Sequence, residues 1–183
     1  MSNQKPEDVR VNVTIYSIEP LKFDVEPVSN GIGKGPNGEI TFKNDRHPGF
    51  NVYFDLVNPP EGYVFPPNKK KKDAVWSALG TDCPEDEIWD VLKPLRTENN
   101  QKTLVVYNAN VAPMLGVFQY TLRVTKDEGA NYVPLDPGGD NMNGPISRSF
   151  DSSALVIGIG SGLATAAALL AAAYLSGLQL VMR

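Results

Sequence analysis

The residue types that most often carry enzyme chemistry are scarce in this chain. It contains one cysteine, Cys83, and one histidine, His47. A single cysteine excludes an internal disulfide and any metal site built from several cysteines, and a single histidine excludes a multi-histidine metal site. A Cys–His catalytic pair would need the two side chains to be close in space, and nothing in their spacing requires this. We expect no metal, no cofactor and no catalytic role for either residue.

Carboxylates are the other potential catalysts, and they cluster in one segment. The cluster comprises Asp82, Glu85, Asp86, Glu87 and Asp90. Paired carboxylates can perform general acid–base catalysis. Acidic residues are also typical of the first turn of a helix, and Thr81 or Asp82 could cap one that ends before Pro94. We therefore predict a short, solvated helix here and a protein that is not an enzyme.

A glycine-rich loop at 29–38 invites comparison with phosphate-binding loops, because glycine stands at 31, 33 and 35. A phosphate-binding loop needs a helix after it, whose N-terminus holds the anion. The residues that follow, Ile40 to Phe42, instead resemble a strand. The sequence therefore predicts a flexible hairpin loop.

A run of four lysines is the clearest candidate for a surface contact: Lys69, Lys70, Lys71 and Lys72. Such a run can bind nucleic acid or anionic lipid, but we expect a solvated loop between strands here. The whole chain has 17 Lys+Arg against 21 Asp+Glu, a net charge of −4. This balance gives no electrostatic reason to expect a nucleic-acid partner.

Strict alternation of apolar and polar residues identifies the elements that would position these side chains. Val9 to Ile18, Phe50 to Leu56 and Phe118 to Val124 all alternate, and Thr103 to Tyr107 is a continuous apolar strand. Roughly seven or eight short strands separated by turn residues predict a mainly β domain over 9–135, after a frayed N-terminus at 1–8. We expect an antiparallel two-layer β-sandwich of possible immunoglobulin-like topology, with a small closed barrel as the alternative.

Several of these segments resemble small bacterial β-sandwich proteins of the DP-EP family. The resemblance covers 9–137 and rests on FNVYFDL, PPEGYVFPP, LVVYNAN, FQYTLRV and YVPLDP. Asp136-Pro137 would match the family's Asp-Pro, and Glu19-Pro20 or Glu26-Pro27 its Glu-Pro. The resemblance implies a fold; it implies no activity and no site residues.

The C-terminal part has a different composition. Residues 136–153 are rich in Gly, Pro, Asn and Ser and predict a flexible linker. Residues 154–182 carry no charged side chain and exceed the roughly 20 apolar residues that span a bilayer. They predict a transmembrane helix, and a helix in the core of a protein assembly is the alternative. Because Met1–Arg10 has no apolar signal segment, we expect a tail-anchored membrane protein with a cytoplasmic head.

Small residues recur every four positions along the predicted helix: Ala154, Gly158, Gly162 and Ala166. Such a row lets helix backbones approach closely in lipid and predicts a homo-oligomer. Together these features predict a non-enzymatic, membrane-anchored binding protein, whose partners are the lipid bilayer, its own copies, and an unidentified protein or small molecule on the head. A membrane-active oligomeric effector of defence or toxin type, or a subunit of a protein assembly, are the alternatives.

Overall fold

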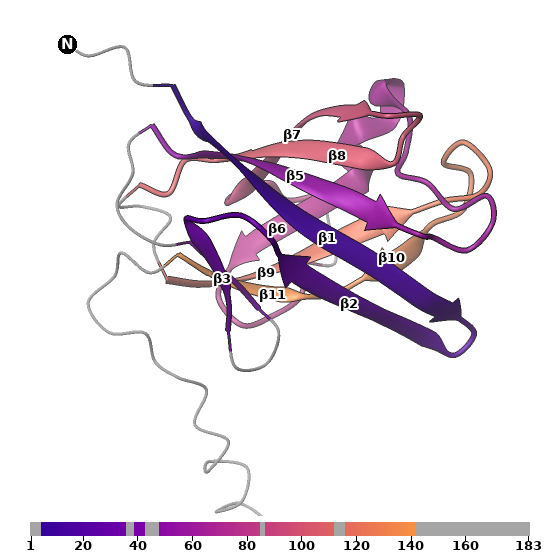
Figure 1. Cartoon of the computed structure of the whole chain (residues 1–183), viewed down its shortest axis with the longest axis horizontal. Coiled ribbons are helices and arrows are strands. Elements are labelled where there is room, and N and C mark those ends of the chain that lie inside the picture. Colours follow the sequence, from indigo (N-terminus) through magenta and orange to yellow (C-terminus); the bar gives the residue numbers. More distant parts are fainter. Residues whose placement is uncertain (1–4, 36–38, 43–47, 85–86, 112–115, 142–183) are drawn as a thin grey trace, which may run out of the picture. The chain divides into compact units, whose positions relative to one another are not determined.

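The computed structural model describes residues 5–35, 39–42, 48–84, 87–111 and 116–141. These residues form a mainly β head, as predicted. Two sheets make up the head (Figure 1). The first has five strands in the order β2 (Leu21–Pro27), β1 (Glu7–Ile18), β5 (Phe50–Val57), β8 (Thr103–Asn108) and β7 (Leu92–Glu98).

The second sheet is built around β9 (Gly116–Val124). It runs β10 (Val133–Leu135), β9, β11 (Gly138–Asn141), β4 (Ile40–Phe42) and β3 (Ile32–Lys34). On its other edge β9 pairs with β6 (Val75–Leu79). The strand β11 lies within the segment predicted as linker, so the sheet continues beyond the predicted domain end at 135.

The prediction of purely antiparallel sheets is wrong. Strand β1 pairs in parallel with β5 along eight residue pairs, from Glu7↔Phe50 to Thr14↔Val57, and β11 pairs in parallel with β4. Parallel neighbours need a long crossover, which is usually a helix. Here the crossover contains β2, β3 and β4, and the last two belong to the second sheet. Strands β1 and β5 therefore pair in parallel without a helix among the described residues of the crossover.

The apolar faces of the two sheets share one core. The predicted alternation is confirmed in β1, where Val9, Val11 and Val13 are buried, and in β5, where Phe50, Val52, Phe54 and Leu56 are buried. Rings from both sheets meet in this core: the Phe54 and Tyr120 centroids are 5.8 Å apart, and those of Phe42 and Phe50 are 5.3 Å apart. Burial of one face of each strand thus fixes which side chains point outward.

The helix predicted from the acidic cluster is wrong. Trp89 forms a bridge with Ser77, and the next strand, β7, contains Pro94. Ser77 competes with the helix for backbone groups, because its N–H donates to Ile88 O at 2.8 Å and its Oγ accepts from Leu92 N at 2.7 Å. Pro94 is tolerated since β7 is an edge strand with an irregular register after it.

Two loops predicted from composition contain regular structure. The lysine run lies in η1 (Asn68–Ala74), a 3-10 helical segment with a kink at Lys70, instead of a loop. Part of the glycine-rich segment is strand β3, which pairs with β4; positions 36–38 lie outside the described residues. Glycine does not prevent pairing here because Ile32 contributes a buried side chain to the core.

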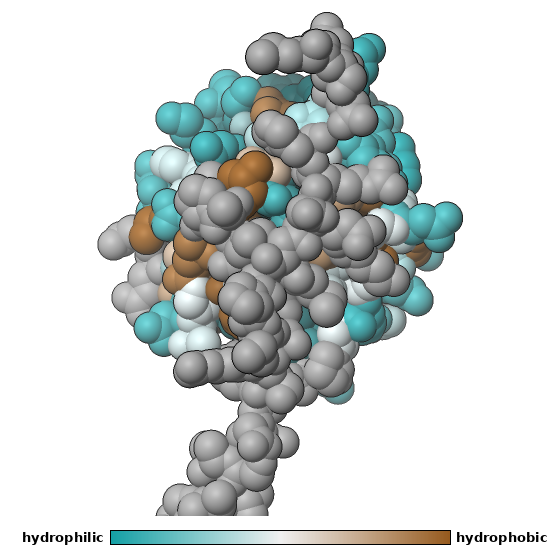
Figure 2. Space-filling view, turned by 90° about the vertical axis from the view of Figure 1, so that its left-hand side faces the viewer, coloured by the Kyte–Doolittle hydropathy of each residue, from teal (hydrophilic) through white to brown (hydrophobic). Residues whose placement is uncertain are grey.

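Among the described residues, no helix has the length and apolar character needed to cross a membrane. The predicted apolar helix at 154–182, with Ala154, Gly158, Gly162 and Ala166, lies outside the described residues. The large apolar side chains that the head exposes lie on separate elements: Tyr16, Leu21, Val28, Leu79, Ile88 and Leu95. Figure 2 accordingly shows hydrophobic residues in small groups among hydrophilic ones on one side of the head.

Candidate functional site

The outer face of the second sheet carries a group of aromatic and charged side chains. The register places Trp76 of β6 opposite Thr121 of β9, and Pro134 of β10 opposite Arg123. Since Tyr120, Leu122 and Val124 are buried in the core, the alternation of β9 directs Thr121 and Arg123 to the outer face. Three neighbouring strands therefore build one site.

Arg123 is held between two aromatic rings. Its guanidinium carbon lies 4.1 Å from the centroid of the Trp76 ring and 4.1 Å from that of Tyr132. Tyr132 is fixed in turn, because its hydroxyl donates to Asp73 Oδ2 at 2.7 Å; burial and the nearby Asp73 carboxylate raise the pKa of Tyr132 to about 12. Within the described residues Arg123 makes no hydrogen bond or ion pair. Its planar array of five N–H donors is held in place, and none of the described residues supplies an acceptor for it.

A cavity of about 370 Å³ lies beside the stacked arginine. Its walls are Trp76, Cys83, Pro84, Thr121, Arg123, Tyr132, Pro134 and Asp136. The Asp136 carboxylate accepts a hydrogen bond from the Thr121 hydroxyl at 2.6 Å. The Trp76 indole Nε1 is buried and has no hydrogen-bond partner in the described part of the chain. We call this cavity the Arg123 pocket.

The one cysteine of the chain, Cys83, lines this pocket, and its surroundings do not favour the thiolate form. Partial burial, and the negative charges of Asp136 and Asp82, raise the pKa of the exposed Cys83 thiol. Reactive cysteines need the opposite shift, since the thiolate is the nucleophile. His47, the other half of a hypothetical catalytic pair, lies outside the described residues. The described residues also contain no cluster of three His, Cys, Asp or Glu side chains suited to a metal ion.

The lysine run is engaged largely within the head. Lys70 Nζ donates to Gly129 O at 2.8 Å, and Lys71 Nζ donates to Leu95 O at 2.6 Å. Lys72 Nζ lies 5.3 Å from the centroid of Trp89, whose Nε1 donates to Val75 O. Lys69 is exposed and has no partner among the described residues. The ammonium groups of Lys70, Lys71 and Lys72 therefore all interact with other residues of the head.

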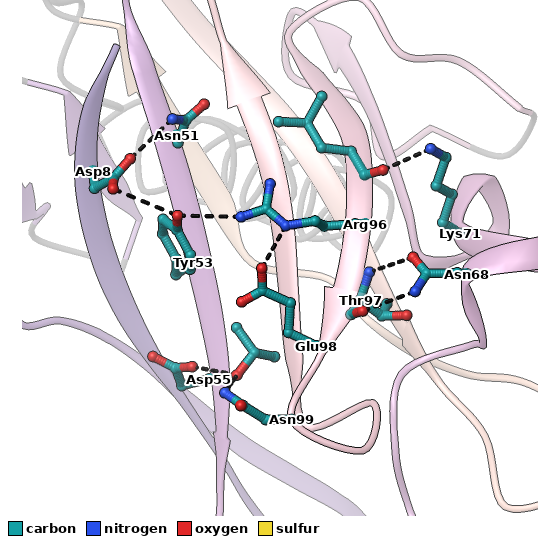
Figure 3. Close-up of polar contacts among 12 residues, drawn as sticks. Asp8, Asn51, Tyr53, Asp55, Asn68, Lys71, Arg96, Thr97, Glu98 and Asn99 are labelled. Atoms are coloured by element: carbon teal, nitrogen blue, oxygen red, sulfur yellow. Dashed lines mark hydrogen bonds and ion pairs between the residues drawn. The ribbon is translucent and has the colours of Figure 1, made fainter. Parts of the chain in front are cut away.

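A second polar cluster covers the outer face of the first sheet, and Figure 3 shows most of it. Tyr53 lies between two arginines, with the guanidinium carbons of Arg10 and Arg96 at 5.0 and 5.9 Å from its ring centroid. Each arginine has its own carboxylate, because Arg10 pairs with Asp55 and Arg96 with Glu98. Both arginines of this second cluster are thus paired with a carboxylate, whereas Arg123 has no such partner among the described residues.

The residues of the Arg123 pocket were not identified from the sequence. Trp76 comes from β6, whereas Tyr132 and Asp136 flank β10, and only the pairing of these two strands with β9 brings the three residues to Arg123. The available signal was the alternation of β9, which already directs Thr121 and Arg123 outward on the same face. The chain matches no protein-family model and no curated protein. The head is a β domain with parallel and antiparallel pairs and a pocket beside Arg123.

Proposed function

We propose that this chain is a non-enzymatic, membrane-anchored binding protein whose head binds an anionic group at Arg123. The observation that supports this is the guanidinium stacked between Trp76 and Tyr132 at 4.1 Å from each ring, with no acceptor among the described residues. A guanidinium fixed in this way offers a planar pair of donors that matches a carboxylate or a phosphate. Because the rings already hold the Arg123 side chain in the folded head, binding a ligand costs little further side-chain entropy, which favours affinity.

The shape of the site supports ligand binding over a structural role for Arg123. A structural arginine is normally paired, as Arg10 and Arg96 are on the first sheet. Arg123 instead borders a cavity of about 370 Å³, within the range of roughly 300–1,000 Å³ typical of small-molecule pockets. The raised pKa of the Cys83 thiol supports binding over nucleophilic catalysis in this pocket.

The anchor in this proposal is the uncharged run at 154–182, which we propose crosses the membrane with the head in the cytoplasm. Its Gly158 and Gly162 support association of several copies. We further propose that the head is an immunoglobulin-like two-layer sandwich related to the DP-EP proteins. The two alternative functions use the same tail. In a membrane-active oligomer it would lie in the bilayer, and in an assembly subunit it would lie in the core of the protein assembly.

Binding at Arg123 is tested by titrating the full chain in detergent with N-acetyl-L-leucine, a carboxylate with an apolar body. Tryptophan fluorescence is the readout, because Trp76 lines the pocket. Arg123→Gln should weaken binding by about tenfold or more, since a charge-assisted hydrogen bond is lost. The matched control is Arg96→Gln, on the other sheet, which should bind as the unchanged chain does. Equal affinity of all three proteins would refute the proposal for the head.

Membrane anchoring is tested by adding charge to the tail of the full chain. Arginines at positions 168 and 172 (Ala168→Arg with Ala172→Arg) should release the protein from the membrane fraction, because each costs about 2.5–3.5 kcal/mol in a bilayer centre. The control, Asn143→Arg, adds charge in the predicted linker and should leave fractionation unchanged. A chain that is equally extractable without detergent in all three forms would refute the anchor.

A further inference from the structure

The Arg123 pocket contains an acidic group as well as the arginine. Asp136 lines the same cavity, yet the two opposite charges do not form an ion pair. One carboxylate oxygen of Asp136 accepts from the Thr121 hydroxyl at 2.6 Å, and Thr121 is its one hydrogen-bond partner among the described residues. After partial burial, the Asp136 carboxylate also helps to raise the pKa of the Cys83 thiol, which lines the same cavity.

The sheet register places the two charged residues diagonally on one face of the sheet. Leu135 pairs with Leu122, so the next residue, Asp136, comes beside Thr121, while Arg123 lies two positions along β9 on the same face. Residues two apart in a strand are about 7 Å apart. A long side chain can bridge this spacing, as the ion pair of Arg96 with Glu98 on β7 shows. Arg123 and Asp136 nevertheless do not pair, because the two rings hold the guanidinium and Thr121 holds the carboxylate. Both groups line the cavity, so a ligand with a positive and a negative group close together can contact the two of them.

A purely anionic ligand would use only one of the two charged groups of this pocket. Its negative charge would approach Arg123 favourably but would also be repelled by Asp136, since like charges in a partly buried site are weakly screened. A ligand with an ammonium group next to its carboxylate satisfies both side chains at once. The walls formed by Trp76, Pro84 and Pro134 offer apolar surface to the rest of such a molecule.

We infer that the Arg123 pocket binds a small zwitterion of the amino-acid type, with its carboxylate on Arg123 and its ammonium on Asp136. This inference rests on the proposed function, since it requires Arg123 to bind the anionic group. The cavity of about 370 Å³ is near the lower end of ligand pockets, which suits one amino acid with an apolar side chain.

Three matched probes test the inference on the full chain in detergent: L-leucine, N-acetyl-L-leucine, which lacks the ammonium, and L-leucinamide, which lacks the carboxylate. L-Leucine should bind about tenfold or more tightly than either of the others, because each loses one charge-assisted contact. N-Acetyl-L-leucine binding as tightly as L-leucine, with both dependent on Arg123, would overturn the zwitterion inference and leave the proposed function intact. Binding of none of the probes in an Arg123-dependent way would overturn both.

Two variants assign each charge of the ligand to its residue. Asp136→Asn should reduce L-leucine affinity to that of N-acetyl-L-leucine, while its side-chain oxygen still accepts from Thr121. Arg123→Gln should reduce L-leucine affinity to that of L-leucinamide. Arg123→Lys keeps the positive charge without the planar array and distinguishes charge from geometry, and thermal unfolding of each variant shows that the head is folded. An Asp136→Asn chain that still prefers L-leucine over N-acetyl-L-leucine tenfold would overturn the assignment of the ammonium to Asp136.

Discussion

Replacing Tyr120 with phenylalanine should stabilise the head, although Tyr120 is one of the largest fully buried side chains. Its ring packs against Phe54 and Phe118, with centroids at 5.8 Å in both cases. Its hydroxyl, however, is buried in the core and has no hydrogen-bond partner among the described residues. Burial alone raises the pKa of Tyr120 well above its ordinary value, in keeping with an apolar surrounding.

The magnitude follows from two opposing contributions. A buried hydroxyl without a partner costs about 1–3 kcal/mol relative to its solvation in water. Its removal loses the dispersion contacts of one oxygen atom, roughly five contacts of about 0.1–0.2 kcal/mol each. The free energy of unfolding should therefore rise by on the order of 1 kcal/mol, which corresponds to an increase of about 3–5 °C in Tm.

Thermal unfolding of the full chain, followed by the circular dichroism of the sheets, measures this change. Tyr107→Phe is the matched control, because the Tyr107 hydroxyl donates to Pro48 O at 2.6 Å. Losing that bond should lower the free energy of unfolding by about 0.5–1.5 kcal/mol. If Tyr120→Phe destabilises the head as much as Tyr107→Phe does, the Tyr120 hydroxyl has a hydrogen-bond partner and the reasoning is refuted.

Three further changes test other parts of the account. Gly49→Ala should lower the free energy of unfolding by on the order of 2–4 kcal/mol in a urea titration, since φ is +92° and the new Cβ would lie 2.2 Å from Asn108 O. Gly80→Ala is the control and should cost clearly less, because its new Cβ would have nothing within 4 Å. Asp127→Asn should destabilise the head at pH 7, because the Thr125 hydroxyl and the backbone and side-chain amides of Asn131 hold the pKa of Asp127 well below its ordinary value. A folded-state pKa below the unfolded one stabilises the fold above about pH 4 and loses that contribution as the pH falls, so the two proteins should converge in stability in acid; a gap that is constant with pH would contradict this. Gly162→Ile should lower the oligomeric state seen by cross-linking in lipid while the protein stays membrane-bound, and an unmodified chain that is already monomeric would contradict self-association.

Local pattern was sufficient to predict most of the strands. In β1, β5 and β9 every second residue is apolar because each strand buries one face. The buried residues of β1 and β5 are those that the alternation indicates, and β9 adds Thr121, which is buried on the outer face beside Asp136. The acidic cluster is a local signal too, but it led to the wrong element. There, contacts made by Ser77 from another strand override the helical preference of the segment.

Pairing between distant segments could not be predicted from such patterns. The parallel neighbours β1 and β5 are joined by a crossover that enters the second sheet, and no local feature of either strand indicates it. The Arg123 pocket depends on the same kind of information. Period-two alternation places Arg123 on an outer face, but the register with β6 and β10 decides that Trp76 and Pro134 surround it.

The central claim is that Arg123 is the cation that receives a ligand, and the NMR signal of its side-chain Nε–H tests this most directly. The isotope-labelled full chain in detergent is titrated with acetate, a small carboxylate. The account predicts a saturable shift of the Arg123 Nε–H and of the Trp76 indole N–H, while Arg96, paired with Glu98, serves as the internal reference and stays unchanged. An Arg123 signal that does not move, or that moves linearly and in step with Arg96, would contradict it.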